Sequence, residues 1–451
     1  MKQIQIKKTW NIYYRGLAVC LSACLILTGC SMPFQTPKTA YTPKASVESS
    51  QEPIGMSKED ASYAALDYLK SMSLKEKVGQ LFVVNLELLD DTRGSFYEWK
   101  KITKKMKENL ENYHVGGVIL FSRNIQKRKQ TKKLIRRLQK NAGIPLFVTV
   151  DEEGGDVARI GNNEKMKTTT FPTMEEIGQQ KDADYVYDMG VTIGQEIGEL
   201  GFNVDFAPVA DVKTSELNKE IGTRSFGDDP AKVSGMVDAF VKGIQSQNVC
   251  ATLKHFPGQG SSSGDTHQGS VDIDSSISSL RKIDFKPFEA GIEAGADFIM
   301  VSHISVSKVT ESSEPASMSD LIMTTILRDE LRFDGLIVTD AFDMASITDN
   351  YTPGEAACGS FKAGADIIVM PQDLDEAYQS VLKSIQDGVI SEKRLDDSVL
   401  RILRLKFQRG IMDLEDLANA KEVTSASDSE PSTASAVTAT PKARKHSAKK
   451  S

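Results

Sequence analysis

The chain has 451 residues and a formal net charge of -7, and 40% of its residues are hydrophobic. This length allows one large domain or two medium ones, and the apolar fraction is sufficient for a substantial core. The negative charge argues against a general nucleic-acid partner, because nucleic-acid binding requires a basic surface.

The N-terminal segment 1–29 has the organisation of a bacterial secretion signal. Residues 1–15 are basic and polar, and residues 16–28 are apolar but too few for an ordinary membrane-spanning helix. The run ends in Leu-Thr-Gly-Cys at 27–30, which resembles a bacterial lipobox. This resemblance implies that the signal is removed and that Cys30 carries a lipid anchor at the extracytoplasmic face of the cell membrane. An uncleaved N-terminal anchor is the alternative.

The five cysteines of the chain do not indicate a disulfide framework. Cys20 and Cys24 lie in the predicted signal, and Cys30 is the predicted lipidation site. The remaining Cys250 and Cys358 lie in apolar surroundings, and no Cys-x-x-Cys pattern of a metal site is present.

Two low-complexity segments flank a central domain at 59–415. Residues 30–58 are rich in Ser, Thr and Pro and are predicted to be a flexible, disordered tether. Residues 416–451 include a Ser-, Thr- and Ala-rich stretch with a basic end, which cannot bury a core, and we expect a disordered tail. The basic end is either simply solvated or in contact with anionic lipid or wall polymer.

Between these segments, short apolar runs alternate with helical segments. The eight apolar runs are 79–85, 117–121, 145–150, 204–209, 250–254, 298–301, 335–339 and 366–370, and helical patterns lie for example at 126–141, 185–200 and 321–330. This alternation predicts an α/β fold with a parallel sheet, and eight units predict a (β/α)8 TIM-type barrel as the single catalytic domain. A doubly wound open sheet is the alternative, but no Gly-rich dinucleotide fingerprint follows the first run.

Polar residues suited to chemistry follow most of these apolar runs. In a (β/α)8 barrel the carboxyl ends of the strands meet at one face, which carries the active site. The residues at these ends include Asp151 and Arg159 after the third run, Asp211 and Arg224 after the fourth, Lys254, His255, Asp265 and His267 after the fifth, His303 after the sixth, and Asp340 and Asp343 after the seventh. A purely structural barrel does not need this concentration of functional groups.

The stretch 254–267 is the most informative part of the chain. It contains two of the five histidines, together with a lysine, an aspartate and several glycines. A buried strand that ends in Lys-His and continues into a Gly/Ser loop is typical of the substrate-binding rim of a barrel. Glycines in such a loop permit a ligand to approach the backbone closely.

Seven motifs in this order resemble glycoside hydrolase family 3, in particular its branch of bacterial β-N-acetylhexosaminidases. They are EKVGQL (76–81), GGVILF (116–121), DEEGG (151–155), GTRSF (222–226), KHFPG (254–258), DTH (265–267) and VTDA (338–341). The resemblance covers residues 73–409. It implies a barrel that hydrolyses β-linked N-acetylglucosamine (GlcNAc) saccharides.

The family uses a retaining mechanism, and its nucleophile corresponds to Asp340. A carboxylate at a strand end can form a glycosyl-enzyme ester, which divides one difficult displacement into two easier ones. Asp343 is the competing candidate, and we expect it to cap the following helix or to hold the loop.

The resemblance assigns the acid/base role to His267, paired with Asp265. An imidazole that titrates near neutral pH can donate and then accept a proton, and an aspartate can orient its ring. The Gly/Ser loop would bring His267 into place when substrate binds.

The remaining strand-end residues are predicted to bind the sugar. Asp151 corresponds to an acceptor of hydrogen bonds from sugar hydroxyls, and a set of donors surrounds the same ring, namely Arg159, Arg224, Lys254 and His255. His303 is either a ligand contact or a histidine whose hydrogen bonds are satisfied within the protein. Met344 is a further candidate for the site.

Two positions beside the predicted site depart from the family pattern. Gln259 stands where many relatives have histidine, and Asp156 stands where many have arginine. Both leave the predicted reaction type intact. We expect them to affect loop closure and recognition of the leaving group.

The predicted activity is that of a lipid-anchored exo-β-N-acetylglucosaminidase that removes terminal GlcNAc from peptidoglycan-derived muropeptides. No metal and no cofactor is expected, since two side chains supply the nucleophile and the proton. A phosphorylase is the nearest alternative, because a neutral imidazole admits phosphate more easily than a carboxylate does. Two further alternatives are a metal hydrolase using His255, His267, Asp265 and His303, and a non-catalytic wall-binding lipoprotein.

Overall fold

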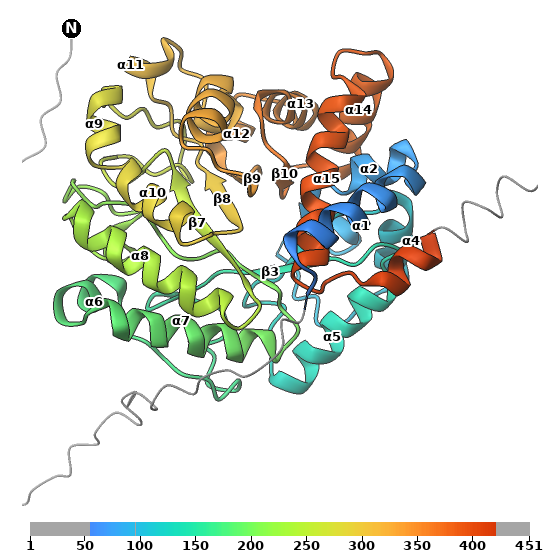
Figure 1. Cartoon of the computed structure of the whole chain (residues 1–451), viewed down its shortest axis with the longest axis horizontal. Coiled ribbons are helices and arrows are strands. Elements are labelled where there is room, and N and C mark those ends of the chain that lie inside the picture. The colour runs from blue at the N-terminus through green and yellow to red at the C-terminus, as the bar shows by residue number, and fades with distance from the viewer. Residues whose placement is uncertain (1–54, 95, 421–451) are drawn as a thin grey trace, which may run out of the picture. The chain divides into compact units, whose positions relative to one another are not determined.

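The computed structural model describes residues 55–94 and 96–420, and these fall within one compact unit (Figure 1). The predicted signal at 1–29, the lipidation site Cys30, most of the predicted tether and residues 421–451 of the predicted tail lie outside the described residues. Within the described part, no helix combines the length and the apolar character needed to cross a bilayer.

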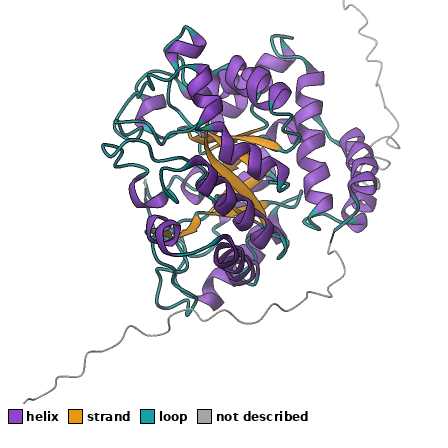
Figure 2. Cartoon of the chain, turned by 60° about the vertical axis from the view of Figure 1, so that its left-hand side comes forward, coloured by secondary structure: helices purple, strands orange, loops and turns teal. Residues whose placement is uncertain are grey.

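Eight parallel strands close into a barrel that is surrounded by helices (Figure 2). The strands are β1 (Phe82–Val84), β2 (Gly117–Ile119), β3 (Phe147–Val150), β6 (Val204–Asp205), β7 (Cys250–Phe256), β8 (Phe298–Val301), β9 (Leu336–Ala341) and β10 (Ile367–Val369). Each strand pairs with its neighbours in chain order, and β10 pairs with β1. The predicted (β/α)8 barrel is confirmed, and each of the eight apolar runs overlaps one strand.

Helices follow the strands around the barrel. The α-helices are α1 (Lys58–Ser71), α2 (Leu74–Gly79), α3 (Leu86–Leu89), α4 (Lys104–Tyr113), α5 (Arg128–Asn141), α6 (Met174–Gln180), α7 (Ala183–Gly198), α8 (Pro230–Gln245), α9 (Ile277–Lys282), α10 (Phe285–Glu293), α11 (Ser307–Thr310), α12 (Ala345–Thr348), α13 (Pro353–Ala363), α14 (Leu374–Gln386) and α15 (Glu392–Gln408). The 3-10 helices η1 (Gly222–Arg224) and η2 (Ala316–Met318), the π-helix η3 (Leu321–Glu330) and the hairpin of β4 (Glu152–Gly154) and β5 (Val157–Ala158) complete the fold.

Helix α5 illustrates how the sequence pattern places a helix on the barrel. Its buried residues are Thr131, Leu134, Ile135 and Leu138, at the spacing of one helical face. The Lys and Arg residues between them occupy the opposite face. The helix therefore buries a narrow apolar stripe against the barrel and presents a basic surface outside.

The strand that carries the predicted nucleophile is held by a buried carboxylate, Asp366. Its Oδ2 accepts the backbone N–H of Ile337 in β9 at 3.0 Å and an N–H of Arg328 at 2.6 Å. Its Oδ1 accepts hydrogen bonds from Ser398 and Arg401 of α15. Asp366 thus connects β9 to helices on two sides, which fixes the strand in the barrel.

The ends of the folded unit lie outside the predicted domain limits. The backbone N–H of Met56 donates to the carbonyl oxygen of Phe407 at 3.2 Å, and Tyr68 of α1 packs edge-to-face on the Phe407 ring at 6.3 Å. Helix α1 therefore lies against α15 (Figure 1), and residues 55–58 belong to the fold and not to the tether. At the other end, residues 414–420 are helical and Leu417 is buried, so the tail begins later than residue 416.

Candidate active site

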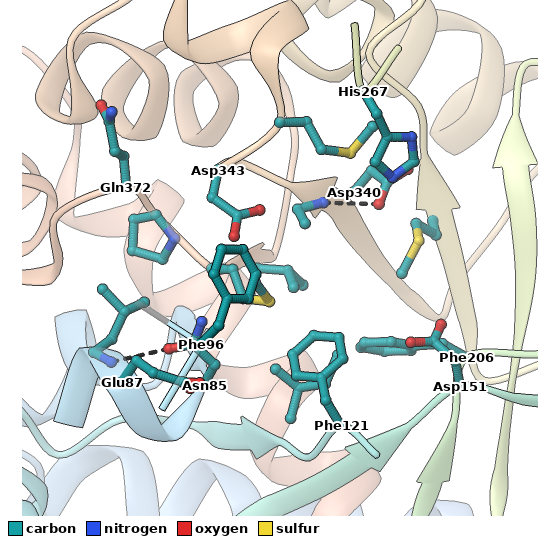
Figure 3. Close-up of a pocket in the computed structure, with 18 of the residues that line it drawn as sticks. Asn85, Glu87, Phe96, Phe121, Asp151, Phe206, His267, Asp340, Asp343 and Gln372 are labelled. Atoms are coloured by element: carbon teal, nitrogen blue, oxygen red, sulfur yellow. Dashed lines mark hydrogen bonds between the residues drawn. The ribbon is translucent and has the colours of Figure 1, made fainter. Parts of the chain in front are cut away.

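A pocket of about 1090 Å³ lies at the carboxyl ends of the barrel strands (Figure 3). It contains every residue that was predicted to act in catalysis or sugar binding, namely Asp151, Arg159, Arg224, Lys254, His255, Asp265, His267 and Asp340. These residues come from the ends of four strands, β3, β6, β7 and β9, and from the loops that follow them, and the closure of the barrel brings them together. Met344 also lines the pocket, as expected of a site residue.

A buried charge network occupies one side of this pocket. Lys254 is 2% exposed, and its Nζ lies 2.9 Å from Asp151 Oδ1 and 2.6 Å from Glu153 Oε1. Arg224 forms two hydrogen bonds to Glu153, at 2.8 and 2.9 Å, and Arg159 lies 3.6 Å from Asp151. Although burial opposes it, the charges of Lys254 and Arg159 hold the pKa of Asp151 below its usual value.

Glu153 is a central member of this network that the sequence analysis did not identify. It is buried, and it bridges Arg224 and Lys254. Despite its burial, these two cations hold the pKa of Glu153 well below its usual value. The signal was present in the three consecutive acids of the DEEGG motif, but sequence alone does not show which of them turns toward the cations.

The neighbouring acid Glu152 has a different environment. Its carboxylate accepts the backbone N–H groups of Ile160 and Gly161 at 2.8 and 2.7 Å. Burial raises the pKa of Glu152 to about 7, against these hydrogen bonds. Glu152 therefore supports the β4–β5 hairpin and does not line the pocket.

His255 is oriented by a second buried carboxylate, Asp211. The ring Nδ1 lies 2.7 Å from Asp211 Oδ2, and the ring Nε2 lies 3.5 Å from Arg224 Nη2. Since Nδ1 donates to the carboxylate, Nε2 is left as an acceptor for the arginine or for a sugar hydroxyl. Asp211 was noted as a strand-end residue in the sequence, but its orienting role becomes visible only in the structure.

The two departures from the family pattern are not members of the buried charge network. Gln259 is buried, its backbone N–H donates to Asp211 Oδ1 at 2.6 Å, and its carbonyl oxygen accepts from Asn218 at 2.7 Å. Asp156 accepts a hydrogen bond from Thr223 Oγ1. Both residues therefore connect loops around the site, and neither lines the main pocket.

Asp340 lies at the end of β9 and faces the pocket (Figure 3). Its Oδ1 accepts the backbone N–H of Ala341 at 2.8 Å. Asp343 lines the same pocket, and the expectation that it caps the following helix is wrong, because Met344 is the N-cap of α12 and no side chain caps that helix. Desolvation by the pocket walls, together with the charge of Asp340, raises the pKa of Asp343 to about 6.

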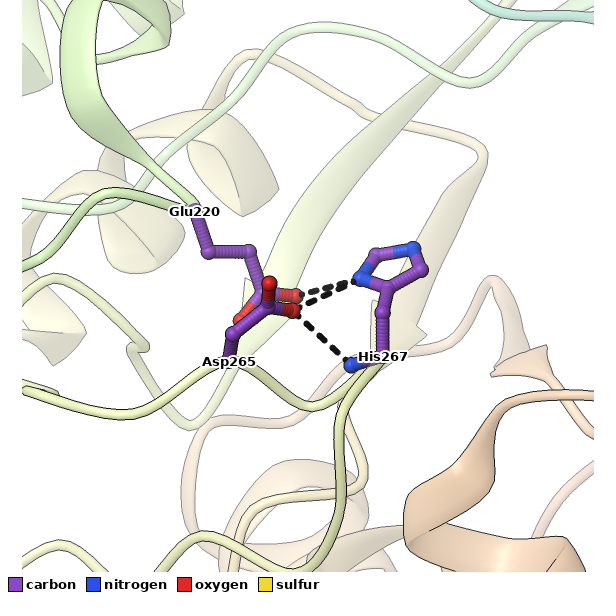
Figure 4. Close-up of side chains that lie close together, drawn as sticks. All are labelled: Glu220, Asp265 and His267. Atoms are coloured by element: carbon purple, nitrogen blue, oxygen red, sulfur yellow. Dashed lines mark hydrogen bonds and ion pairs between the residues drawn. The ribbon is translucent and has the colours of Figure 1, made fainter.

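His267 makes the predicted contact with Asp265 and a second contact that the sequence did not indicate. Its Nδ1 lies 3.1 Å from Asp265 Oδ1 and 3.2 Å from Glu220 Oε1 (Figure 4). The hydrogen bond to Glu220 is the largest influence on this ring, and it raises the pKa of His267 to about 9. Partial burial opposes this shift, whereas the charge of Asp340 and the hydrogen bond to Asp265 act in the same direction as Glu220.

The histidines proposed for a metal hydrolase are not brought together as a ligand set. His303 is buried, its Nε2 donates to the carbonyl oxygen of Ala341 at 3.0 Å, and its Nδ1 lies 2.8 Å from Ser317 Oγ. Burial lowers the pKa of His303. Both ring nitrogens are thus satisfied within the protein, and His303 supports the end of β9.

Within the described residues, one group of acid and histidine side chains comes close enough to hold a cation. It consists of Glu220, Asp265 and His267, whose ligand-type atoms lie within 4.8 Å of one another. In the structure the Nδ1 atom of His267 lies 3.1 Å from Asp265 Oδ1 and 3.2 Å from Glu220 Oε1, which is hydrogen-bond distance to both carboxylates.

The comparison with known families agrees with the geometry of this pocket. The family model for the glycosyl hydrolase family 3 N-terminal domain matches residues 73–405 of the sequence. The chain belongs to glycoside hydrolase family 3. This confirms the predicted resemblance and makes the protein a glycoside hydrolase.

Curated relatives cover most of the barrel. Beta-hexosaminidase A of Pseudoalteromonas piscicida is 35% identical over 330 residues, which are 67% of this chain but only 55% of that relative. Beta-hexosaminidase LpqI of Mycobacterium tuberculosis is 30% identical over 399 residues, which are 87% of this chain and 97% of that relative. Among solved structures, a family 3 β-N-acetylglucosaminidase from a Paenibacillus species matches with a TM-score of 0.70 and 31% identity, over 78% of this chain and 68% of that one.

Proposed function

We propose that this glycoside hydrolase is a retaining exo-β-N-acetylglucosaminidase that releases terminal GlcNAc from peptidoglycan-derived fragments. The observation that carries the proposal is the placement of Asp340 and His267 in one pocket beside a buried set of charged hydrogen-bonding groups. The names of the relatives, beta-hexosaminidase and β-N-acetylglucosaminidase, support the choice of sugar.

In the first step Asp340 attacks the anomeric carbon and forms a glycosyl ester, while the glycosidic bond breaks. The departing oxygen takes a proton from Nε2 of His267, because Nδ1 is engaged with the carboxylates of Asp265 and Glu220. The high pKa of His267 supplies the protonated ring that this step requires.

In the second step water replaces the enzyme at the anomeric carbon and the ester to Asp340 breaks. The neutral His267 accepts the proton of the attacking water. The ester no longer carries the negative charge of Asp340, which in the free enzyme helps to raise the pKa of His267. Formation of the ester therefore lowers the proton affinity of the ring and suits it to its second role as a base.

The charged network would hold the sugar ring. Lys254, Arg159 and Arg224 offer donors, Asp151 offers an acceptor, and His255 offers the Nε2 atom left free by its tautomer. These groups are already paired with one another, so they are fixed in position before substrate arrives. A hydroxyl-rich ring can replace or extend these hydrogen bonds.

The decisive assay compares 4-nitrophenyl N-acetyl-β-glucosaminide with the corresponding glucoside. Hydrolysis of the first in large excess over the second supports the proposal, and absence of turnover on both would support the non-catalytic alternative. Product analysis with and without phosphate tests the phosphorylase, which would release the sugar 1-phosphate. A GlcNAc-β-1,4-linked muropeptide then tests the proposed natural substrate by release of free GlcNAc.

We further propose that the enzyme is held at the cell membrane by a lipid on Cys30. The support is the lipobox-like sequence at 27–30 that follows a short apolar run. This location would place the pocket on the extracytoplasmic side, where wall-derived fragments arise.

A further inference from the structure

One buried carboxylate links the loop that carries His267 to a different part of the barrel rim. Glu220 lies between β6 and α8, and its side chain is 8% exposed. Its Oε1 accepts the hydroxyl of Thr266 at 2.6 Å, and its Oε2 accepts the backbone N–H of Thr266 at 3.0 Å. The same Oε1 lies 3.2 Å from Nδ1 of His267. A single side chain therefore contacts two consecutive residues of the loop, and Figure 4 shows its contact with the catalytic ring of His267.

Glu220 and Asp265 both contact His267, but they belong to different segments of the chain. Asp265 lies on the same loop as His267, only two residues away, and accepts both the backbone N–H and the ring Nδ1 of His267. It therefore moves with the ring if the loop moves. Glu220 belongs to another segment, so it is the contact that orients the imidazole relative to the rest of the site.

The segment of Glu220 is itself fixed in the barrel. An N–H of Arg224 donates to the carbonyl oxygen of Glu220 at 3.2 Å, and Arg224 is paired with the buried Glu153. The side chain of Asn218 accepts the backbone N–H of Ile221 at 2.9 Å and donates to Gln259 at 2.7 Å. The position of Glu220 is thereby coupled to the charged network that would hold the sugar.

The electrostatic surroundings favour a charged pair of Glu220 and His267. Four carboxylates influence the ring: Glu220 and Asp265 at Nδ1, and Asp340 and Asp343 across the pocket. Glu220 also faces His255. The Glu220 side chain is 8% exposed and that of Asp265 is 33% exposed, so water screens the charge of Glu220 less.

We propose that Glu220 is a positioning residue for the acid/base His267. It holds the imidazole in the Nδ1–H tautomer with Nε2 free, stabilises its protonated form, and fixes the loop at the pocket through Thr266. This inference rests on the proposed function, in which His267 exchanges protons with the leaving group and with water.

The first test measures the ring directly and does not depend on activity. His267 is titrated by NMR in protein with labelled histidine, and its signal is assigned with a His267→Gln variant. In Glu220→Gln the proton affinity of His267 should fall by at least about tenfold. The matched control is Glu216→Gln, which removes an exposed acid of the same segment that pairs only with Lys213 at 3.6 Å. This control should leave the titration unchanged.

A second variant keeps the test valid if Glu220→Gln does not fold. In Asp265→Asn the exposed partner is lost and Glu220 remains, so the pKa of His267 should stay above that of an ordinary histidine. A return to the ordinary value in Asp265→Asn would overturn the proposal, as would an unchanged titration in Glu220→Gln.

The third measurement is the pH profile of kcat/KM, which reports ionisations of the free enzyme. For a disaccharide, activity falls as pH rises through the pKa of the general acid, and Glu220→Gln should move this alkaline limb to lower pH. A glycoside with an acidic phenol needs little protonation, and its glycosylation rate should change less than about threefold. If the alkaline limb of the kcat/KM profile of Glu220→Gln lies at the same pH as in the original protein, the proposed role of Glu220 is contradicted.

The acid/base role of His267 and the positioning role of Glu220 can be refuted separately. If His267→Ala loses activity equally on both substrates, the proposed acid/base role of His267 is wrong. If His267→Ala shows the expected dependence on the leaving group but Glu220→Gln leaves the titration and the limb unchanged, the positioning role of Glu220 alone is wrong.

Discussion

Asp211 accepts two hydrogen bonds from His255 through one oxygen, from the backbone N–H at 3.2 Å and from ring Nδ1 at 2.7 Å. Its other oxygen accepts the backbone N–H of Gln259 at 2.6 Å. One fully buried carboxylate therefore fixes both the end of β7 and the tautomer of His255, the histidine that we propose to bind the sugar.

This relationship predicts the effect of Asp211→Asn. An amide has one acceptor oxygen, whereas the carboxylate has two. In the variant the NH2 group therefore faces either a backbone N–H or the ring N–H, and that donor loses its acceptor. We expect kcat/KM to fall about tenfold to a hundredfold, since a hydrogen bond to a buried charge is lost. The control is Asp238→Asn, which breaks only a pair between Asp238 and Lys242 on the surface of α8. Equal activity of the two variants would contradict the role of Asp211.

A second prediction concerns the nucleophile. Asp340→Ala should lower turnover by at least about a thousandfold while leaving the thermal transition of the fold in place, because it removes the carboxylate proposed to form the ester. A mechanism-based fluorosugar should label Asp340, as shown by peptide mass spectrometry. The matched variant is Asp343→Asn, which should still be labelled at Asp340. Labelling of Asp343 in an active Asp340→Ala protein would transfer the role to Asp343.

The barrel was predictable because its signals are local. Each strand is a short apolar run of consecutive residues, and the polar residues that follow it reach the same face by the geometry of a parallel barrel. The roles that were missed depend on contacts that are not local. Glu153, Asp211 and Glu220 contact residues that lie 71, 44 and 46 positions away in the sequence. Sequence shows that such acids exist, but only the closed barrel shows which cations and rings they face.

The errors at the domain limits have a similar cause. Met56 follows a Ser-rich stretch, and Leu417 lies in an acidic segment shortly before the Ser- and Thr-rich stretch, so composition assigned them to the tether and the tail. In the structure Met56 is bonded to Phe407 and Leu417 is buried, so a few isolated contacts decide where the fold begins and ends. The expectation that Asp343 caps a helix failed because α12 begins at Ala345 and its N-cap is Met344, one residue after Asp343.

A third prediction concerns the dependence of stability on pH. Lys406 of α15 is fully buried, and its Nζ donates to Gln80 at 2.7 Å and lies 5.0 Å from the centre of the Phe147 ring. Burial lowers the pKa of Lys406 to about 7. In the unfolded chain the pKa is about 10.4. Between these values the unfolded chain binds more protons, so this residue makes stability rise with pH from about 7 to about 10.

Lys406→Met should remove this dependence. The variant has no buried ammonium group that destabilises the fold. Its free energy of unfolding minus that of the original protein should therefore be largest near pH 6 and smallest near pH 10. Loss of the hydrogen bond to Gln80 should lower the free energy of unfolding of the variant by about 1 kcal/mol at every pH. Denaturant titrations at several pH values measure the difference. A difference that does not vary with pH would show that Lys406 titrates normally in the fold.

A fourth prediction tests the membrane anchor. Cys30→Ser should release the protein from membranes or leave it as a longer precursor, because serine cannot form the thioether that carries the lipid. Fractionation of cells and gel mobility measure the outcome. Cys250→Ser is the matched control, since this cysteine is buried in the barrel and should not affect location. Identical fractionation of Cys30→Ser and the original protein would refute the anchor.

The last prediction separates the two steps assigned to His267. Protonation matters most when the departing oxygen is a poor leaving group. His267→Ala should therefore be severely slow on a disaccharide, yet it should form the glycosyl-enzyme much faster from an aryl glycoside with an acidic phenol. Deglycosylation would then limit turnover, because the attacking water has lost its base. Rapid-quench measurement of the first turnover resolves the two steps.

Azide provides the complementary test, because this anion attacks the glycosyl-enzyme without needing a base. It should restore part of the second step in His267→Ala and yield a β-glycosyl azide, whose configuration also reports retention. Asp265→Ala should show a milder form of the same behaviour, since Glu220 still holds the ring at Nδ1. Equal losses on both substrates without rescue by azide would mean that His267 only binds substrate and that the proton comes from another group, for which Asp343, with its raised pKa, lies in the same pocket.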